Sequence, residues 1–173
     1  MAAGPEDGED RGGRAWVFGD HVNTDVIAPG RYLKGPVEEL ARHALEDIAP
    51  DFAPGVEPGD VVVAGAMFGI GSSREQAPQA LKMLGVGAIL ARSFARIFYR
   101  NAINLGLPAL VCDEVARIAP GDRLVVDAGA GTVENLSRGE SYACEAMPPH
   151  LIAIIADGGL LPHLEKRLRG AAG

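Results

Sequence analysis

Short, uninterrupted apolar runs recur along the chain and are separated by longer segments with helical periodicity. Four such runs are predicted to be strands, at residues 16–18, 61–64, 88–91 and 108–111. Continuous apolar strands are typical of a parallel sheet whose faces are both covered. The last three runs alternate with two helical segments, and this strand–helix–strand–helix–strand order predicts a parallel sheet with right-handed crossovers.

The helical segments are recognised by their apolar spacing and by the residues that bound them. One helix is expected over residues 36–48, with Pro36 at its favoured first position. Its apolar positions fall on one face of a helix: Val37, Leu40, Ala41, Ala44, Leu45 and Ile48. Two further helices are expected, one after residue 72 that ends at Gly85 and one over 94–104 that ends at Gly106.

The pattern changes after the fourth run. Residues 122–127 and 131–136 are strand-like segments separated by glycine, which predicts an antiparallel β layer. Residues 148–156 and 160–168 are expected to be terminal helices. The sequence therefore predicts an α/β protein with a mainly parallel sheet and an added antiparallel β layer. We expect a disordered tail over residues 1–13 and a single domain over 14–173.

Composition excludes several classes of protein. The 173 residues carry 16 Lys and Arg against 23 Asp and Glu, a net charge of −7, which argues against broad nucleic-acid binding. No apolar stretch approaches the ~20 residues of a membrane span, and no apolar signal segment is present, so a cytoplasmic chain with reduced thiols is expected. Two cysteines cannot supply the ligands of an iron–sulfur cluster, and no close Cys/His spacing indicates a zinc site.

The residues with the clearest chemical potential lie in the glycine-rich stretch 65–78. Ser72 and Glu75 have the spacing of a capping box, and we expect Ser72 to cap the helix that follows. Pro78 has no N–H to give to the carbonyl of Arg74, so this helix must kink there or restart with Pro78 in its first turn.

A cap does not explain why three glycines and an arginine occupy the same turn. The glycines allow a close backbone approach. Exposed N–H groups, the Ser72 and Ser73 hydroxyls and the planar guanidinium of Arg74 together indicate an anion site, best suited to a carboxylate. The stretch has neither the Gly-Lys-Ser/Thr of a phosphate-binding Walker loop nor the Gly-x-Ser-x-Gly of a nucleophile elbow.

A second polar group contains Asn23, Thr24 and Asp25, followed by Tyr32 and Lys34. These residues are either a polar loop that caps a helix or a binding loop that faces the glycine turn.

Three arginines, Arg92, Arg96 and Arg100, recur every four residues and would share one face of a helix. That face would be solvated, would dock an acidic partner, or would contribute to a positive pocket.

Together these motifs resemble the small subunit of 3-isopropylmalate dehydratase and, more broadly, the swivel domain of aconitases and homoaconitases. The matching stretches are residues 19–33, 60–82, 91–108 and 158–162. The resemblance implies a three-layer β/β/α fold and a dehydration–rehydration that moves a hydroxyl between neighbouring carbons of a malate-type acid. It also implies that the 4Fe-4S cluster belongs to a separate large subunit, with no cofactor bound by this chain.

The resemblance also assigns roles to individual residues. Ser72 would be the base that removes the carbon-bound proton, Arg74 would hold a substrate carboxylate, and Ser73 would add a hydrogen bond to it. The resemblance places the loop with Tyr32 and Lys34 where the family recognises the variable substituent. On the binding-loop interpretation given above, Asn23, Thr24 and Asp25 are expected to bind the substrate as well.

The sequence departs from many relatives of this family at two positions. Ile70 stands where they have cysteine, and Gln76 stands where they have histidine. Neither change touches the Ser-Ser-Arg core, but both are expected to alter pH dependence or substrate choice.

These motifs leave the identity of the substrate open. An apolar pocket suits an isopropyl group, whereas a cation at Lys34 suits the extra carboxylate of homoaconitate, and 2,3-dimethylmalate is a third malate-type acid. The alternatives of another class are a non-catalytic anion-binding module and an assembly scaffold, and intact Ser72 and Arg74 argue against the scaffold.

Overall fold

The computed structural model describes residues 12–172. Most of the expected tail, residues 1–11, lies outside the described residues. Gly13, also placed in the tail, is buried and is the first residue of a strand. A side chain at this position would clash with the backbone, because an added Cβ would lie 1.9 Å from the carbonyl oxygen of Gly59.

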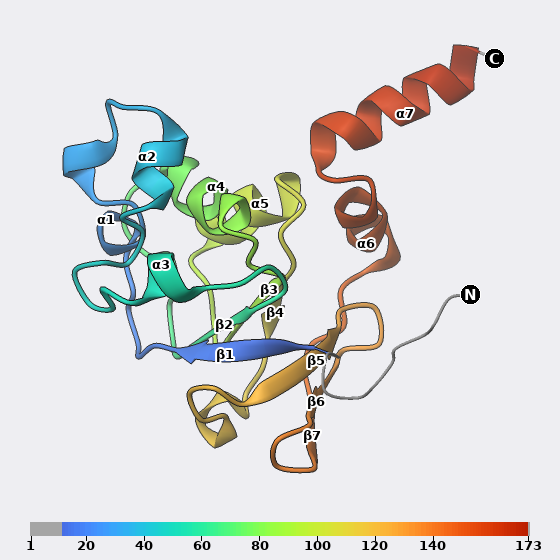
Figure 1. Cartoon of the computed structure of the whole chain (residues 1–173). Helices are drawn as coiled ribbons and strands as arrows, with labels where there is room; N and C mark the ends of the chain where they lie inside the picture. Colours follow the sequence, from blue (N-terminus) through green and yellow to red (C-terminus); the bar gives the residue numbers. More distant parts are fainter. Residues whose placement is uncertain (1–11, 173) are drawn as a thin grey trace, which may run out of the picture.

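Four parallel strands form the centre of the molecule (Figure 1). They are β1 (Gly13–Val17), β2 (Val61–Ala64), β3 (Ala88–Ala91) and β4 (Ala109–Val111), in the spatial order β4-β3-β2-β1. In the parallel register Trp16 lies opposite Val62, and Val62 lies opposite Ile89. The predicted parallel sheet is confirmed.

Three antiparallel strands continue the sheet beyond β1. They are β5 (Arg123–Asp127), β6 (Thr132–Asn135) and β7 (Glu140–Ala143). The added antiparallel part is therefore confirmed and is continuous with the parallel strands through the short pairing of β1 with β5. Its third strand, β7, was not predicted, since the sequence 140–143 contains only two apolar residues.

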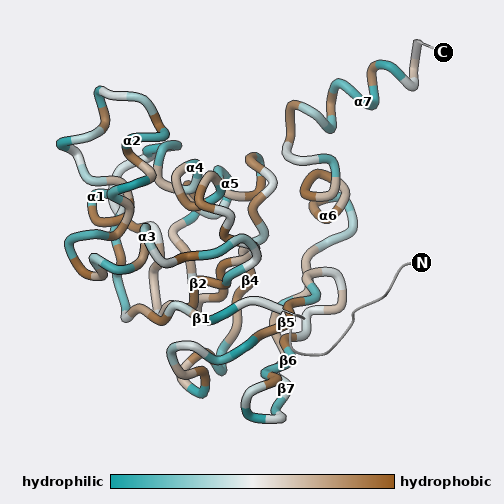
Figure 2. Tube along the Cα trace, in the orientation of Figure 1, coloured by the Kyte–Doolittle hydropathy of each residue, from teal (hydrophilic) through white to brown (hydrophobic). Residues whose placement is uncertain are grey.

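Helices cover the parallel strands and bury their apolar side chains. Figure 1 shows α4 (Gln76–Met83) and α5 (Arg96–Asn104) above the strands, with α2 (Val37–Ala41) beside α4. In Figure 2 the tube is mostly brown around β2 and β4. The strand cores and the helix residues that pack on them are at most 3% exposed: Val61, Val62, Val63, Ile89, Leu90, Leu110, Ala77, Leu81 and Phe98.

The helix expected over residues 36–48 is wrong in its second half. α2 ends at Ala41 and hydrogen-bonded turns follow it, with Leu45 in the left-handed region at φ +60°. The apolar stripe still predicted burial through Leu45, which is 0% exposed, but Ile48 is 51% exposed. Beyond Ala41 the helical ladder gives way to turns: the N–H groups of Arg42, His43 and Ala44 donate to carbonyls three residues back, and the N–H of Leu45 donates to Ile27.

Four further short elements and two terminal helices complete the described chain. The short elements are α1 (Thr24–Ile27), η2 (Gly30–Tyr32), α3 (Phe52–Gly55), η3 (Val115–Arg117) and the turns between them. The terminal helices α6 (Pro149–Ala156) and α7 (Leu160–Ala172) are confirmed, and Figure 1 shows α7 extending away from the sheet. None of the described helices combines the length and apolar character needed to cross a membrane.

Gly69 is the glycine with the most demanding environment in the loop after β2. Its φ is +84°, and an added Cβ would lie 2.2 Å from the ring of buried Phe98. We expect Gly69→Ala to lower the free energy of unfolding by about 3 kcal/mol, since strain and overpacking act together. Gly19→Ala is the matched control, because nothing lies within 4 Å of its added Cβ. Urea unfolding monitored by circular dichroism measures both, and equal midpoints for the two variants would contradict the expectation.

Candidate active site

The candidate site lies where β1 and β2 end side by side. Because parallel strands point the same way, the loops that follow their carboxyl ends meet at one edge of the sheet, the usual place for a ligand site. The Asp20 carboxylate accepts from the N–H of Ala66 at 2.7 Å. Further along, the N–H of Thr24 donates to the carbonyl of Ile70 at 2.9 Å. The two polar groups that the sequence singled out are therefore neighbours.

The glycines of this turn approach other parts of the same chain rather than a ligand. An added Cβ on Gly65 would lie 1.9 Å from the Asp20 carboxylate, and one on Gly71 would lie 3.1 Å from the hydroxyl of Thr24. The close approach predicted from the glycines is present, but it packs the two loops together.

The predicted capping box at Ser72 and Glu75 is wrong. Helix α4 begins at Gln76 with Glu75 as its N-cap, and no side chain caps it. Pro78 lies in the first turn of the helix, where its missing N–H costs no hydrogen bond. Of the two alternatives for this segment, the structure shows the helix that begins with Pro78 in its first turn and not a helix kinked at Pro78. Ser72 and Ser73 consequently lie outside the helix, and both are exposed.

Ser72 is bonded twice to Thr24. Its backbone N–H donates to the Thr24 hydroxyl oxygen at 3.0 Å, and the two hydroxyl oxygens are 3.0 Å apart. Thr24 is 1% exposed at the start of α1. Thr24 was predicted to bind substrate, and its burial instead favours a role through Ser72.

Residues in and after the other polar group hold the Arg74 side chain in place. Its Nη1 forms an ion pair with Asp25 at 2.5 Å and donates to the carbonyl of Ala28 at 3.1 Å. The Arg74 side chain is 25% exposed. While Nη1 is held by the protein, the guanidinium carries further N–H donors on Nη2 and Nε, and a forked set of donors suits a carboxylate.

Asn23 has a structural task in the same loop. Its side-chain oxygen accepts from the N–H of Val26 at 2.9 Å and caps α1. The helix-capping interpretation of this polar group therefore holds for Asn23, while Thr24 and Asp25 turn toward Ser72 and Arg74.

Among residues 12–172, no hydrogen bond or ion pair joins Tyr32 or Lys34 to the serine–arginine turn. The Tyr32 ring stacks on His43, with centroids 3.8 Å apart, and its hydroxyl lies 3.4 Å from Glu46. A hydrogen bond to Glu46 raises the pKa of His43, so this contact network favours the imidazolium. Lys34 follows η2 and is exposed.

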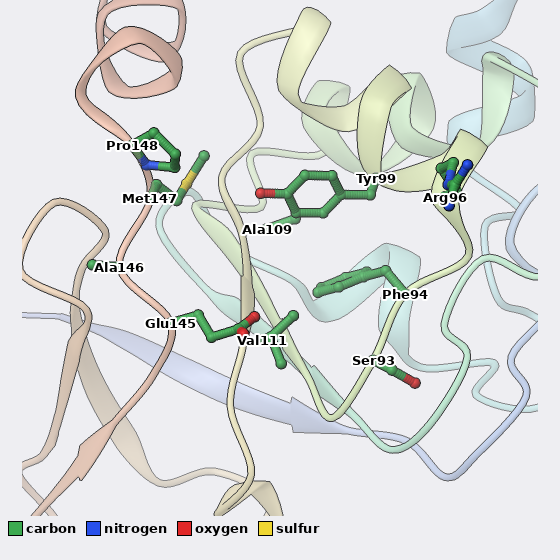
Figure 3. A pocket seen from close by; sticks show the side chains of 10 residues that line it. All are labelled: Ser93, Phe94, Arg96, Tyr99, Ala109, Val111, Glu145, Ala146, Met147 and Pro148. Carbon is green, nitrogen blue, oxygen red and sulfur yellow. The ribbon is translucent and has the colours of Figure 1, made fainter.

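The three arginines with four-residue spacing do not share a helix face. Arg92 follows the end of β3, and only Arg96 and Arg100 lie on α5. Figure 3 shows Arg96 beside a cavity of about 530 Å³ between α5 and the segment after β7. Tyr99 and Glu145 also line this cavity, and none of the predicted site residues does.

The sequence missed a contact between the two cysteines. Cys112 follows β4 and is 0% exposed, and a hydrogen bond between the two thiols lowers the pKa of Cys112 while raising that of Cys144. Within residues 12–172 no three His, Cys, Asp or Glu side chains gather as a metal site. Two thiols on their own do not fit an iron–sulfur cluster, which takes a larger set of cysteine ligands.

The mixed sheet with the Ser-Ser-Arg turn at its edge defines an aconitase-type domain. Residues 47–114 match the family profile described as the Aconitase C-terminal domain. A crystal structure of 3-isopropylmalate dehydratase from Methanocaldococcus jannaschii superposes with a TM-score of 0.87 at 43% identity, covering 93% of this chain and 98% of that one.

Curated relatives place the chain within this class. The 3-isopropylmalate dehydratase small subunit 1 of Thermotoga maritima is 50% identical over 156 residues, which are 89% of this chain and 94% of the relative. The methanogen homoaconitase small subunit of Methanothermobacter thermautotrophicus is also 50% identical, over 90% of this chain and 91% of the relative. The chain belongs to the family of 3-isopropylmalate dehydratase small subunits.

Proposed function

We propose that this chain is the small subunit of a hydro-lyase that interconverts 2-isopropylmalate and 3-isopropylmalate by dehydration and rehydration, a step of leucine biosynthesis in the cytoplasm. The observation that carries the proposal is the pairing of an exposed Ser72, held by Thr24, with an Arg74 held by Asp25. Relatives named as this small subunit share about half of its residues over most of its length.

Ser72 acts as the base in this proposal. Its Oγ takes the proton from the carbon next to the one that bears the hydroxyl, and the electron pair left behind forms the double bond as the hydroxyl departs. A neutral serine is too weak for this step, so Ser72 needs alkoxide character, stabilised by hydrogen-bond donors and by the charge of Arg74. Its exposure leaves the oxygen accessible to a substrate.

Arg74 and Ser73 orient the substrate. The guanidinium binds the carboxylate beside the reacting carbon in a forked geometry and stabilises the negative charge that develops there. The exposed Ser73 hydroxyl donates a further hydrogen bond to the same carboxylate. Because Arg74 is anchored by Asp25 and Ala28, the substrate is held with little cost of ordering the side chain.

A large subunit completes the site. Ser72, Ser73 and Asp25 are exposed, so this half-site needs a second surface to exclude water. We propose that the partner carries the 4Fe-4S cluster, since the cysteines of this chain do not fit one. The cluster, when bound there, supplies the Lewis acid for the leaving hydroxyl.

A homoaconitase small subunit is the second candidate function. The similarity to the Methanothermobacter relative is as high as that to the Thermotoga one, so identity does not separate them. The exposed Lys34 favours this candidate, because a cation suits an additional carboxylate. A purely anion-binding module would use the same hydroxyls and the same anchored arginine, so turnover of a substrate is what separates it from the enzyme.

A substrate panel tests the proposed function. The chain is combined with its large subunit and offered 3-isopropylmalate, homoaconitate and 2,3-dimethylmalate at equal concentrations. We expect 3-isopropylmalate to have the highest kcat/KM, and a higher value for homoaconitate would favour the second candidate. No turnover of any of the three would contradict both.

Lys34→Val tests the substrate selector. If Lys34 faces the variable substituent, removing its charge lowers kcat/KM for homoaconitate relative to 3-isopropylmalate by about 5-fold, because an exposed charge interaction contributes at most about 1 kcal/mol. The matched control is Lys166→Val on α7, where the lysine pairs with Asp157. An unchanged ranking of substrates in Lys34→Val would remove Lys34 as the selector.

A further inference from the structure

We propose that Thr24 is a positioning residue whose hydroxyl donates a hydrogen bond to the oxygen of Ser72 whenever that oxygen is deprotonated. This inference rests on the proposed role of Ser72 as the base. It gives Thr24 a task different from the substrate contact expected from the sequence.

Thr24 is held rigidly in place. Its side chain is buried, its N–H donates to Ile70 at 2.9 Å, and its carbonyl accepts from Ala28 at 2.8 Å. A β-branched side chain has few rotamers, so the hydroxyl direction is fixed once the backbone is. The absence of a side chain on Gly71 leaves room for this hydroxyl, because an added Cβ would lie 3.1 Å from it.

Counting protons at the Thr24 hydroxyl fixes its role. A hydroxyl has one hydrogen to donate and two lone pairs with which to accept. One lone pair already accepts the N–H of Ser72 at 3.0 Å. The hydroxyl oxygen of Ser72 lies 3.0 Å from the hydroxyl oxygen of Thr24. While Ser72 is protonated, either hydroxyl donates; once Ser72 has lost its proton, only Thr24 has a hydrogen to give.

The consequence is a bond that strengthens as charge develops on Ser72. Hydrogen bonds to a charged oxygen are roughly twice as strong as neutral ones. A preorganised donor that stabilises such charge accelerates a reaction by about 10²-fold or more. The bond from the Ser72 N–H also fixes the loop, so Thr24 both places the base and lowers the cost of its charged form.

Thr24→Val tests this role in the two-subunit enzyme, because valine keeps the shape and loses the hydroxyl. We expect kcat to fall about 10²-fold with KM within about twofold of the wild-type value. The rise of kcat/KM with pH should move to higher pH, since the Ser72 oxygen becomes harder to deprotonate. Thr24→Ser, which retains the hydroxyl, should restore both kcat and the pH profile.

A second measurement separates this inference from the proposed function. In the isolated chain, the amide hydrogen of Ser72 should exchange slowly in the wild type and in Thr24→Ser, and fast in Thr24→Val. If the wild-type complex is active and Thr24→Val keeps its kcat and pH profile, the Thr24 inference is wrong and the proposed function stands. A rise in KM alone would also overturn it. An inactive wild-type complex would overturn the proposed function and with it the role given to Thr24.

Discussion

Replacing Ser72 with alanine will leave the two subunits assembled and lower kcat by about 10³-fold or more, since a positioned base contributes about 10² to 10⁴ in rate. The hydroxyl is the only group lost, and it lies outside α4, so the helix and the sheet beneath it are undisturbed. Steady-state kinetics with 3-isopropylmalate measure the loss. Excess Ser72→Ala chain should also inhibit the wild-type enzyme, because it competes for the large subunit without supplying a base.

Ser141→Ala is the matched control for this substitution. Ser141 is an exposed serine on β7, in the antiparallel part of the sheet. It should have wild-type kinetics. Full turnover by an assembled Ser72→Ala complex would show that another group removes the proton.

Arg74→Lys will lower kcat/KM by about 10²-fold, with KM raised and kcat reduced together, since hydrogen bonds to charged groups contribute about 1.5–3 kcal/mol each. Lysine keeps the positive charge but has no planar fork. It cannot bind Asp25 and the carbonyl of Ala28 while it also presents two donors to a carboxylate. Initial rates over a range of substrate concentration separate the two effects.

The control for charge alone is Arg138→Lys, in the turn before β7. Its nearest carboxylate, on Asp122, is 3.9 Å away, so it makes no close forked contact. We expect this control to match the wild type. If Arg74→Lys did so as well, charge without geometry would suffice and the forked contact would be refuted.

The sequence predicted the parallel core well because its strands are buried on both faces. Residues 61–64 and 88–91 are apolar without interruption, and every residue in them is buried. Elements fixed by tertiary contacts were less predictable. The apolar stripe runs on to Ile48 and so predicts a helix longer than α2. The local pattern does not reveal that the N–H of Leu45 bonds to Ile27. Strand β7 is held by pairing with β6 and has little apolar character of its own.

The sequence located the candidate site but not its internal connections. The glycines, Ser72 and Arg74 lie in one stretch, so their proximity was predictable. Ser72 and Thr24 are 48 positions apart, and Arg74 and Asp25 are 49 positions apart. Only the adjacency of β1 and β2 reveals that these pairs are in contact. The capping box failed for a local reason, because a proline in the first helical turn moved the start of α4 beyond the serines.

Subunit complementation is the most direct measurement of the shared site. The rate of 3-isopropylmalate conversion is measured for this chain alone, for the large subunit alone, and for the two combined. We predict that neither subunit turns over substrate by itself and that the mixture does, with a rate that saturates as this chain is added. Turnover by the large subunit without this chain would contradict the assignment of the proton-removing half of the site to Ser72 and Arg74.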